Sequence, residues 1–308
     1  MQALSLFDLL WPLGVAVFVW WLSTGLVLML DGLPRRTFRM SMGGLTVLGL
    51  AAMVCLTRTA QHATVAGAYA AFLCALLVWA WIELSFLTGW ITGPSKQGAR
   101  PGARGMERFS QAVAAIAWHE LAIALLAISV LALTWNEPNP VAAWTFLVLW
   151  IMRTSAKLNL FLGVRNTNED WLPPHLAYLA SFFRRRAMNP LFPVVVSLAT
   201  VVLGWLVHAA LKPGLSAHMT VGLLLTAALL GLAVLEHWLL VLPLPSTWLW
   251  RWAMRRHEPA PEEKATDAVS DPTPSRALTT HRPHAPAVLA HPLPNVNGPN
   301  GPPAGQTP

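Results

Sequence analysis

The sequence predicts an all-α, polytopic integral membrane protein with seven transmembrane helices, a periplasmic N-terminus and a cytoplasmic C-terminus. Of the 308 residues, 55% are hydrophobic and only 11% are charged, and the mean hydropathy is +0.50. Soluble domains carry about 25% charged residues, so this balance indicates lipid as the main solvent. Two further observations support the prediction: a series of apolar runs of bilayer length, and a one-sided distribution of basic residues between them.

The apolar runs define the predicted spans, because a helix needs about 20 mainly apolar residues to cross a bilayer. We predict spans at 9–30, 40–56, 64–92, 110–134, 141–162, 191–211 and 219–243. The first run is long enough to span and has no basic segment before it, so we expect a span there and no cleavable signal peptide. The second run is short and rich in glycine, which makes it the least regular of the set.

The basic residues between the runs predict the orientation. Segments placed inside carry Arg35, Arg36, Arg39, Lys96, Arg100, Arg104, Arg108, Arg165, Arg184, Arg185, Arg186, Arg251, Arg255 and Arg256, whereas segments placed outside carry Arg58 and Lys212. Cytoplasmic loops are enriched in Lys and Arg, so the bias predicts an outside N-terminus and a cytoplasmic C-terminus. Basic residues in short clusters between apolar runs also argue against nucleic acid as the partner of this positively charged chain.

Two segments outside the spans have a character of their own. In the inside connection 163–190, residues 175–188 are expected to form a short basic helix, either lying in the membrane interface or acting only as a positive-inside stop. Residues 1–252 are predicted to form the membrane domain, and residues 253–308 a disordered, Pro-rich cytoplasmic tail that lacks apolar periodicity. Cys55 and Cys74 both lie inside apolar runs, which gives no disulfide framework and no zinc spacing.

Ionisable residues inside the predicted spans form the candidate site. We call them the buried-charge layer: Glu83, His119, Glu120, Arg153, Lys157, Glu236 and His237. Each charged group costs roughly 2.5–3.5 kcal/mol at a helix centre, so it is retained only where it pairs, faces water or binds something. Counted from the predicted helix ends, the residues on all four helices lie roughly 10–14 Å below the inner surface. We therefore expect these side chains to converge.

The sequence around the two histidines is mirrored. Trp118-His119-Glu120-Leu121 is repeated in reverse as Leu235-Glu236-His237-Trp238, and the two helices are predicted to run antiparallel. The two tetrapeptides would therefore present the same groups in the same vertical order.

Three interpretations of the buried-charge layer remain open at this point. It is a structural ion-pair network that holds the helices together. Alternatively, it is a ligand site in which His119 or His237 coordinates a metal or the magnesium of a tetrapyrrole, with a glutamate as its partner. The third interpretation is a proton or solute path. The spacing of a di-iron site is absent, and the last span has no lysine for a retinal Schiff base.

Short polar motifs carry a resemblance to a known family. They are FVWWLSTG at 18–25, DGLPRRTF at 31–38, SAKLN at 155–159, FLGV at 161–164, SFFRRR at 181–186 and LEHW at 235–238. These motifs closely resemble those of the PuhE-type photosynthetic complex assembly protein 2 of purple bacteria, and the resemblance covers nearly all of residues 10–252. It is specific because the matches fall at loop and charged positions and not in interchangeable Leu and Val runs.

The resemblance implies a function connected with the photosynthetic apparatus. Members of the family accompany the genes for the reaction-centre H subunit and for bacteriochlorophyll synthesis. The chain is therefore expected to assist assembly of the reaction centre with its core antenna, or to regulate bacteriochlorophyll supply, in the inner or intracytoplasmic membrane. Its expected partners are reaction-centre or light-harvesting subunits or pigment-synthesis enzymes, and bacteriochlorophyll or a metal is a candidate cofactor.

The alternative is a metal- or tetrapyrrole-binding membrane protein or enzyme that uses the buried His and Glu residues; a transporter is disfavoured because no internal repeat is detectable. The family supplies no catalytic residues to transfer.

Overall fold

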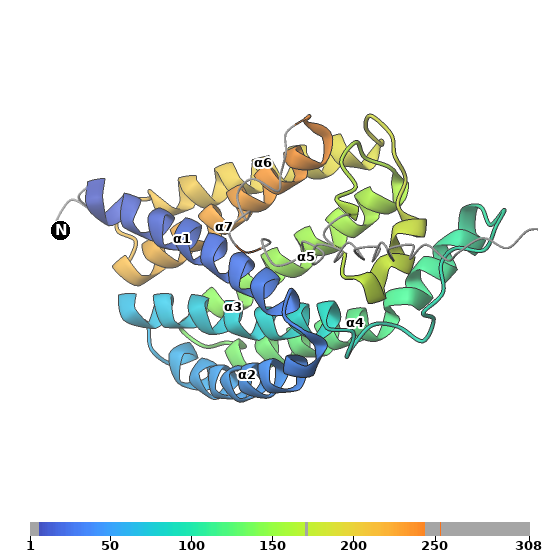
Figure 1. Cartoon of the computed structure of the whole chain (residues 1–308). Helices are drawn as coiled ribbons and strands as arrows, with labels where there is room; N and C mark the ends of the chain where they lie inside the picture. Colours follow the sequence, from blue (N-terminus) through green and yellow to red (C-terminus); the bar gives the residue numbers. More distant parts are fainter. Residues whose placement is uncertain (1–5, 170–171, 244–252, 254–308) are drawn as a thin grey trace, which may run out of the picture. The chain divides into compact units, whose positions relative to one another are not determined.

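A computed structural model of the chain describes residues 6–169, 172–243 and 253, and its described part is built from helices (Figure 1). The helices are α1 (Leu6–Asp31), α2 (Phe38–Ala60), α3 (Val65–Leu87), α4 (Gly105–Thr134), α5 (Val141–Leu162), α6 (Leu191–Ala210) and α7 (Ala217–Val241), with 3₁₀ helices η1 (Arg35–Thr37) and η3 (Pro174–Phe182). Seven helices in these residues are long and apolar enough to cross a membrane, as predicted. The described residues contain no strand apart from an isolated bridge between Val164 and Arg185. Apart from Ala253, the predicted tail lies outside the described residues.

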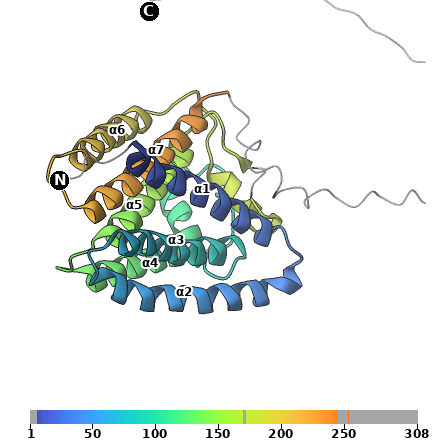
Figure 2. The ribbon, with the colours of Figure 1, turned by 90° about the vertical axis from the view of Figure 1, so that its left-hand side faces the viewer.

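Helices α3, α5 and α7 contact one another and form the centre of the helical bundle (Figures 1 and 2). Helix α1 packs on α7 and α3, α2 on α3, α4 on α5, and α6 on α7. Of the seven, α3 and α7 are the most buried. Three central helices that share contacts can bring together polar groups that lie far apart in the sequence.

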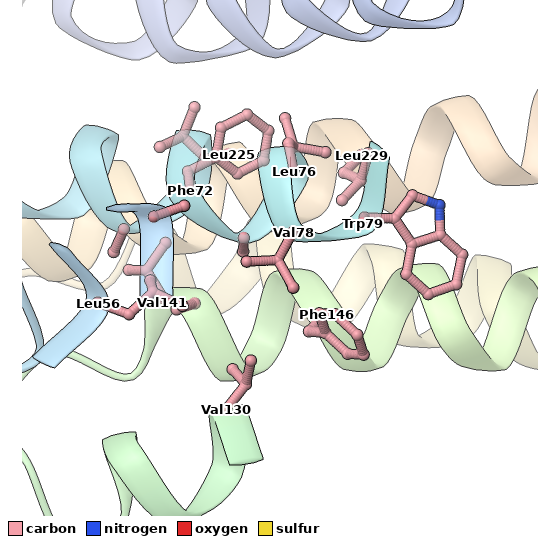
Figure 3. Packing of buried hydrophobic residues seen from close by; sticks show 14 of the residues in the cluster. Leu56, Phe72, Leu76, Val78, Trp79, Val130, Val141, Phe146, Leu225 and Leu229 are labelled. Carbon is pink, nitrogen blue, oxygen red and sulfur yellow. The ribbon is translucent and has the colours of Figure 1, made fainter. Parts of the chain in front are cut away.

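Large apolar side chains fill the space between these central helices (Figure 3). Phe72 and Trp79 of α3, Phe146 of α5, and Leu225 and Leu229 of α7 are all buried in one cluster. The rings of Trp79 and Phe146 meet edge to face, with their centroids 5.4 Å apart. Such close packing matters in lipid, where association of helices depends on van der Waals contact and hydrogen bonds.

Helix α3 ends at Leu87, five residues before its predicted end at residue 92. Gly89 adopts a φ of 79°, and the Trp90 N–H donates to the Ser85 carbonyl while the Gly89 N–H donates to the Phe86 carbonyl, both at 2.9 Å. This pair of bonds is a Schellman motif, which requires a residue such as glycine that tolerates positive φ. The apolar run continues through Trp90 and Ile91, so hydropathy alone overestimated the helix.

The segment after α3 folds back onto α4, which begins at Gly105 and not at the predicted residue 110. The Thr92 carbonyl accepts a hydrogen bond from the His119 N–H at 2.8 Å, and the Ser95 N–H donates to the Ala114 carbonyl at 3.3 Å. Gly93 lies between them, so close that a Cβ there would sit 2.2 Å from the Ala114 oxygen. The 88–104 connection is therefore a packed part of the fold.

The connection 163–190 is also packed, and the prediction of a helix over 175–188 is wrong. The helix present is η3, which is a 3₁₀ helix and ends at Phe182. Its apolar residues Leu176, Leu179 and Phe182 pack with Phe86 of α3 and Ala115 of α4. The apolar face that was expected to contact lipid is therefore covered by protein. We call the end of the bundle that carries the connections 88–104 and 163–190 the loop-rich end.

Candidate functional site

The shortest link between the central helices is an ion pair between α5 and α3. Arg153 Nη2 lies 2.9 Å from Glu83 Oε2, within hydrogen-bond distance. The Glu83 side chain is 11% exposed, whereas that of Arg153 is 46% exposed. The carboxylate is thus enclosed, and the guanidinium extends from it toward the surface of the bundle.

A second ion pair joins α5 to α4. Lys157 Nζ lies 2.6 Å from Glu120 Oε1. Residues at i and i+4 share one face of a helix, so Arg153 and Lys157 reach two neighbouring helices from the same side of α5. The sequence predicted that these four side chains belong to one group. It did not indicate which cation pairs with which carboxylate.

Glu236 of α7 accepts a hydrogen bond from the indole N–H of Trp20 on α1, with an N···O distance of 2.9 Å. It also interacts electrostatically with Arg153 and Glu83. Glu236 therefore joins the α5–α3 pair to α1 without forming a direct ion pair of its own among the described residues.

His237 of α7 is buried, and both of its ring nitrogens have partners. Nδ1 lies 2.8 Å from the Ala233 carbonyl oxygen, and Nε2 lies 3.0 Å from Ser155 Oγ on α5. A carbonyl only accepts, so Nδ1 carries the hydrogen and Nε2 accepts from the serine hydroxyl. A metal ion at Nε2 would have to displace Ser155.

His119 of α4 has a different environment. Its side chain is fully buried, its ring lies against Phe86 with centroids 4.4 Å apart, and neither ring nitrogen has a hydrogen-bond partner among the described residues. Glu83 Oε1 is likewise buried without a partner there, and the two side chains interact electrostatically. Buried polar atoms normally have partners, so these unpaired atoms of His119 and Glu83 distinguish this part of the layer.

The mirrored tetrapeptides do present similar groups, but they use them differently. In both, the histidine is buried and the tryptophan is exposed, with Trp118 at 55% and Trp238 at 42%. Their glutamates, however, meet Lys157 in one case and Trp20 in the other. The mirrored sequence therefore corresponds to the same burial of histidine and tryptophan in both helices. The partner of each glutamate depends on the neighbouring helices.

The depths counted from predicted helix ends were wrong for α3 and α4. Glu83 lies about one turn before the end of α3, and His119 lies roughly four turns after the start of α4. The side chains still come close because the 88–104 connection runs back along α4. Sequence reasoning also missed Trp20, Ser155 and Phe86 as partners of the layer.

These contacts determine which ligands the buried-charge layer can bind. Within the described part of the chain, no group of three or more His, Cys, Asp and Glu side chains could hold a metal ion. Zinc sites in proteins use three or four such ligands. A tetrapyrrole does not fit His119 as it stands, because a ring that is fully buried and covered by Phe86 presents no open face to a macrocycle.

The regions of similarity to known proteins cover almost the same residues as the helices. The family described as "Protein of unknown function (DUF3623)" matches residues 6–261. A relative in Rhodobacter capsulatus, described as "Uncharacterized 30.4 kDa protein in puhA 5'region", is 40% identical over 267 residues, which cover 84% of this chain and 94% of that protein. No solved structure matches the chain. The chain therefore belongs to the DUF3623 family.

Proposed function

We propose that the chain is a multi-pass membrane protein of a purple bacterium that assists assembly of the photosynthetic reaction centre with its core antenna or regulates bacteriochlorophyll supply. The observation that carries the proposal is the relative in Rhodobacter capsulatus, whose description places it in the puhA 5' region, within a photosynthesis gene cluster. The resemblance of the polar motifs to PuhE-type assembly proteins supports the same function. Its partners would be reaction-centre or light-harvesting subunits or pigment-synthesis enzymes.

The arrangement of the helices supports a role in binding partners within the membrane. The ion pairs and the mirrored histidines connect α3, α4, α5 and α7 internally, which leaves the outer faces of the other helices available. On α6 one face is apolar and exposed, with Val194, Leu198, Val201 and Trp205 between 62% and 68% accessible. Such a face contacts lipid or the helix of another membrane protein.

Deletion of the gene in its phototrophic host tests this function. We expect the deletion strain to lose most of its reaction-centre and core-antenna absorption and to recover it with the gene supplied in trans. Free pigment with little assembled complex would indicate assembly as the affected step, whereas low total bacteriochlorophyll with normal subunit synthesis would indicate pigment supply. A strain with unchanged photosynthetic complexes would contradict the proposal.

Membrane insertion and orientation have their own test. Reporter fusions after residue 61 or 137 are expected to report the periplasm, and fusions after residue 98, 168 or 258 the cytoplasm, because basic residues are retained inside. A cytoplasmic signal at residue 137 would contradict the seven-span topology. The fusion at 98 is the most informative, since it lies in the connection that folds back on α4.

A second candidate function is ligand binding at His119, and its unpaired ring nitrogens are the observation that favours it. If the His119 ring binds a ligand, His119→Ala is expected to abolish formation of the photosynthetic complexes, while the variant protein stays at its normal level. His237→Ala is the matched control, because it removes a ring whose nitrogens already bond Ser155 and Ala233, and its effect is expected on protein level. Immunoblots of the membranes and absorption spectra of the photosynthetic complexes provide the measurement; equal effects of both changes would contradict a special role for His119.

A further inference from the structure

A polar cavity of about 260 Å³ lies at the loop-rich end. Three separate segments line it: the start of α2 with η1, the connection after α3, and η3. The lining residues are Arg35, Phe38, Thr88, Gly89, Thr92, Lys96, His175, Leu176 and Tyr178. Segments far apart in the sequence therefore contribute to one half-open cavity.

The charges around this cavity are all of one sign. Arg35 and Lys96 line it, and no acidic side chain is among the lining residues. Neither cation forms an ion pair within the described residues, in contrast to Arg153, Lys157 and Arg185, each of which lies within 3.5 Å of a glutamate oxygen. Two exposed cations that line a half-open cavity without a counter-ion create a positive potential that favours an anion.

The Tyr178 hydroxyl is a neutral hydrogen-bond donor at the cavity. The Tyr178 hydroxyl oxygen is buried and forms no hydrogen bond of ordinary geometry among the described residues, although it lies near the Thr92 side chain. A buried hydroxyl without a partner costs free energy unless a ligand or water bonds it. Burial is the main cause that lowers the pKa of His175, and the charges of Arg35 and Lys96 lower it further. The imidazole is therefore neutral at pH 7, and its Nε2–H is donated to the Leu87 carbonyl oxygen at 2.7 Å.

The walls of the cavity are fixed by the fold and do not depend on a ligand. The His175 bond to Leu87 ties η3 to the end of α3, where the Schellman motif sets the direction of the chain. The Ala99 N–H donates to Ser181 Oγ at 2.8 Å, which ties η3 to the 88–104 connection. A preformed cavity loses less ordering entropy on binding than a flexible one.

We propose that this cavity binds a phosphate group. Arg35 and Lys96 would neutralise the charge of the phosphate, and the Tyr178 hydroxyl would donate a hydrogen bond to one of its oxygens. Basic pockets between helices at the cytoplasmic side of a membrane bind the head groups of anionic lipids, and a soluble phosphate compound offers the same chemistry. A lipid head group as the ligand requires that the chain is inserted in a membrane, as proposed above. A soluble phosphate compound does not require this.

Binding to the full-length protein in phosphate-free detergent solution tests the proposal. One arm measures retention of dioleoyl phosphatidylglycerol against dioleoyl phosphatidylcholine by native mass spectrometry, and the other measures inorganic pyrophosphate by calorimetry. We expect the wild-type chain to bind at least one of the two phosphate probes. The double variant Arg35→Gln/Lys96→Gln is expected to bind it roughly 30-fold more weakly, at about fivefold for each cation near the phosphate.

Two further variants separate the cavity from general surface charge. Arg36→Gln/Arg100→Gln removes two cations from the same segments, but neither lines the cavity, so we expect binding to change less than about threefold. Tyr178→Phe removes only the buried hydroxyl and is expected to weaken binding about tenfold without lowering the melting temperature. Selective retention of phosphatidylglycerol supports a lipid head group, and pyrophosphate binding supports a soluble ligand. The proposal is overturned if neither probe binds, or if both double variants lose binding equally.

Discussion

Replacement of Arg153 by methionine is expected to remove most of the folded protein from the membrane. The Glu83 side chain is only 11% exposed, and Arg153 supplies its one direct ion pair in the described residues. Breaking a buried pair by removing one partner costs about 3–5 kcal/mol, because the remaining charge stays in a medium of low dielectric. That cost is a large fraction of the 5–15 kcal/mol that stabilises an ordinary domain. Immunoblots of membranes and melting curves of the purified protein measure the effect.

The chain offers a matched control for this prediction. Arg185 forms an ion pair with Glu169 at 3.5 Å, but its side chain is 75% exposed. Exposed pairs contribute about 0–1 kcal/mol, so Arg185→Met is expected to leave protein level and melting temperature nearly unchanged. Equal loss in the two variants would show that the enclosed position of Glu83 is not the cause.

The double variant Glu83→Gln/Arg153→Met separates a structural from a functional role of the pair. If the pair only holds α3 to α5, neutralising both members should restore much of the protein level and of the photosynthetic complexes. If the charges take part in function, the double variant should accumulate but remain inactive. Failure of the double variant to accumulate would contradict both interpretations, because no unpaired charge would then explain the loss.

Gly93→Ala is expected to destabilise the loop-rich end strongly, as much as any other glycine-to-alanine substitution in this chain. The new Cβ would lie 2.2 Å from the Ala114 oxygen and 2.4 Å from the Ala115 carbonyl carbon of α4. Both are main-chain atoms of a helix, so neither can rotate away as a side chain does. Overpacking costs about 1–3 kcal/mol, and separation of the two segments would also break the hydrogen bond from His119 N–H to Thr92.

Gly204→Ala in α6 is the control, because a Cβ at that position meets no atom within 4 Å. It adds the same methyl group and raises helix propensity, so its melting temperature should stay equal or rise slightly. The Gly93 variant should lose melting temperature and should also lose phosphate binding at the cavity that Thr92 and Lys96 line. A Gly93→Ala protein with wild-type stability would show that the 88–104 connection does not hold this close contact with α4.

By itself, the sequence determined the all-helical class and the seven apolar helices. These features follow from local composition, because apolar runs of bilayer length form helices. The polar stretch from Arg153 to Asn159 already marked α5 as the least apolar helix of the seven.

Only the tertiary structure decided where α3 stops, which partners the charges choose and what the two long connections do. The end of α3 depends on the backbone conformation of Gly89, which hydropathy does not detect. The pairing of Arg153 with Glu83 and of Lys157 with Glu120 depends on how α3, α4 and α5 are rotated against one another. The basic cavity combines three segments that no local pattern connects. Contacts between distant segments are set by packing of the whole bundle, and for that physical reason a pattern along the chain does not contain them.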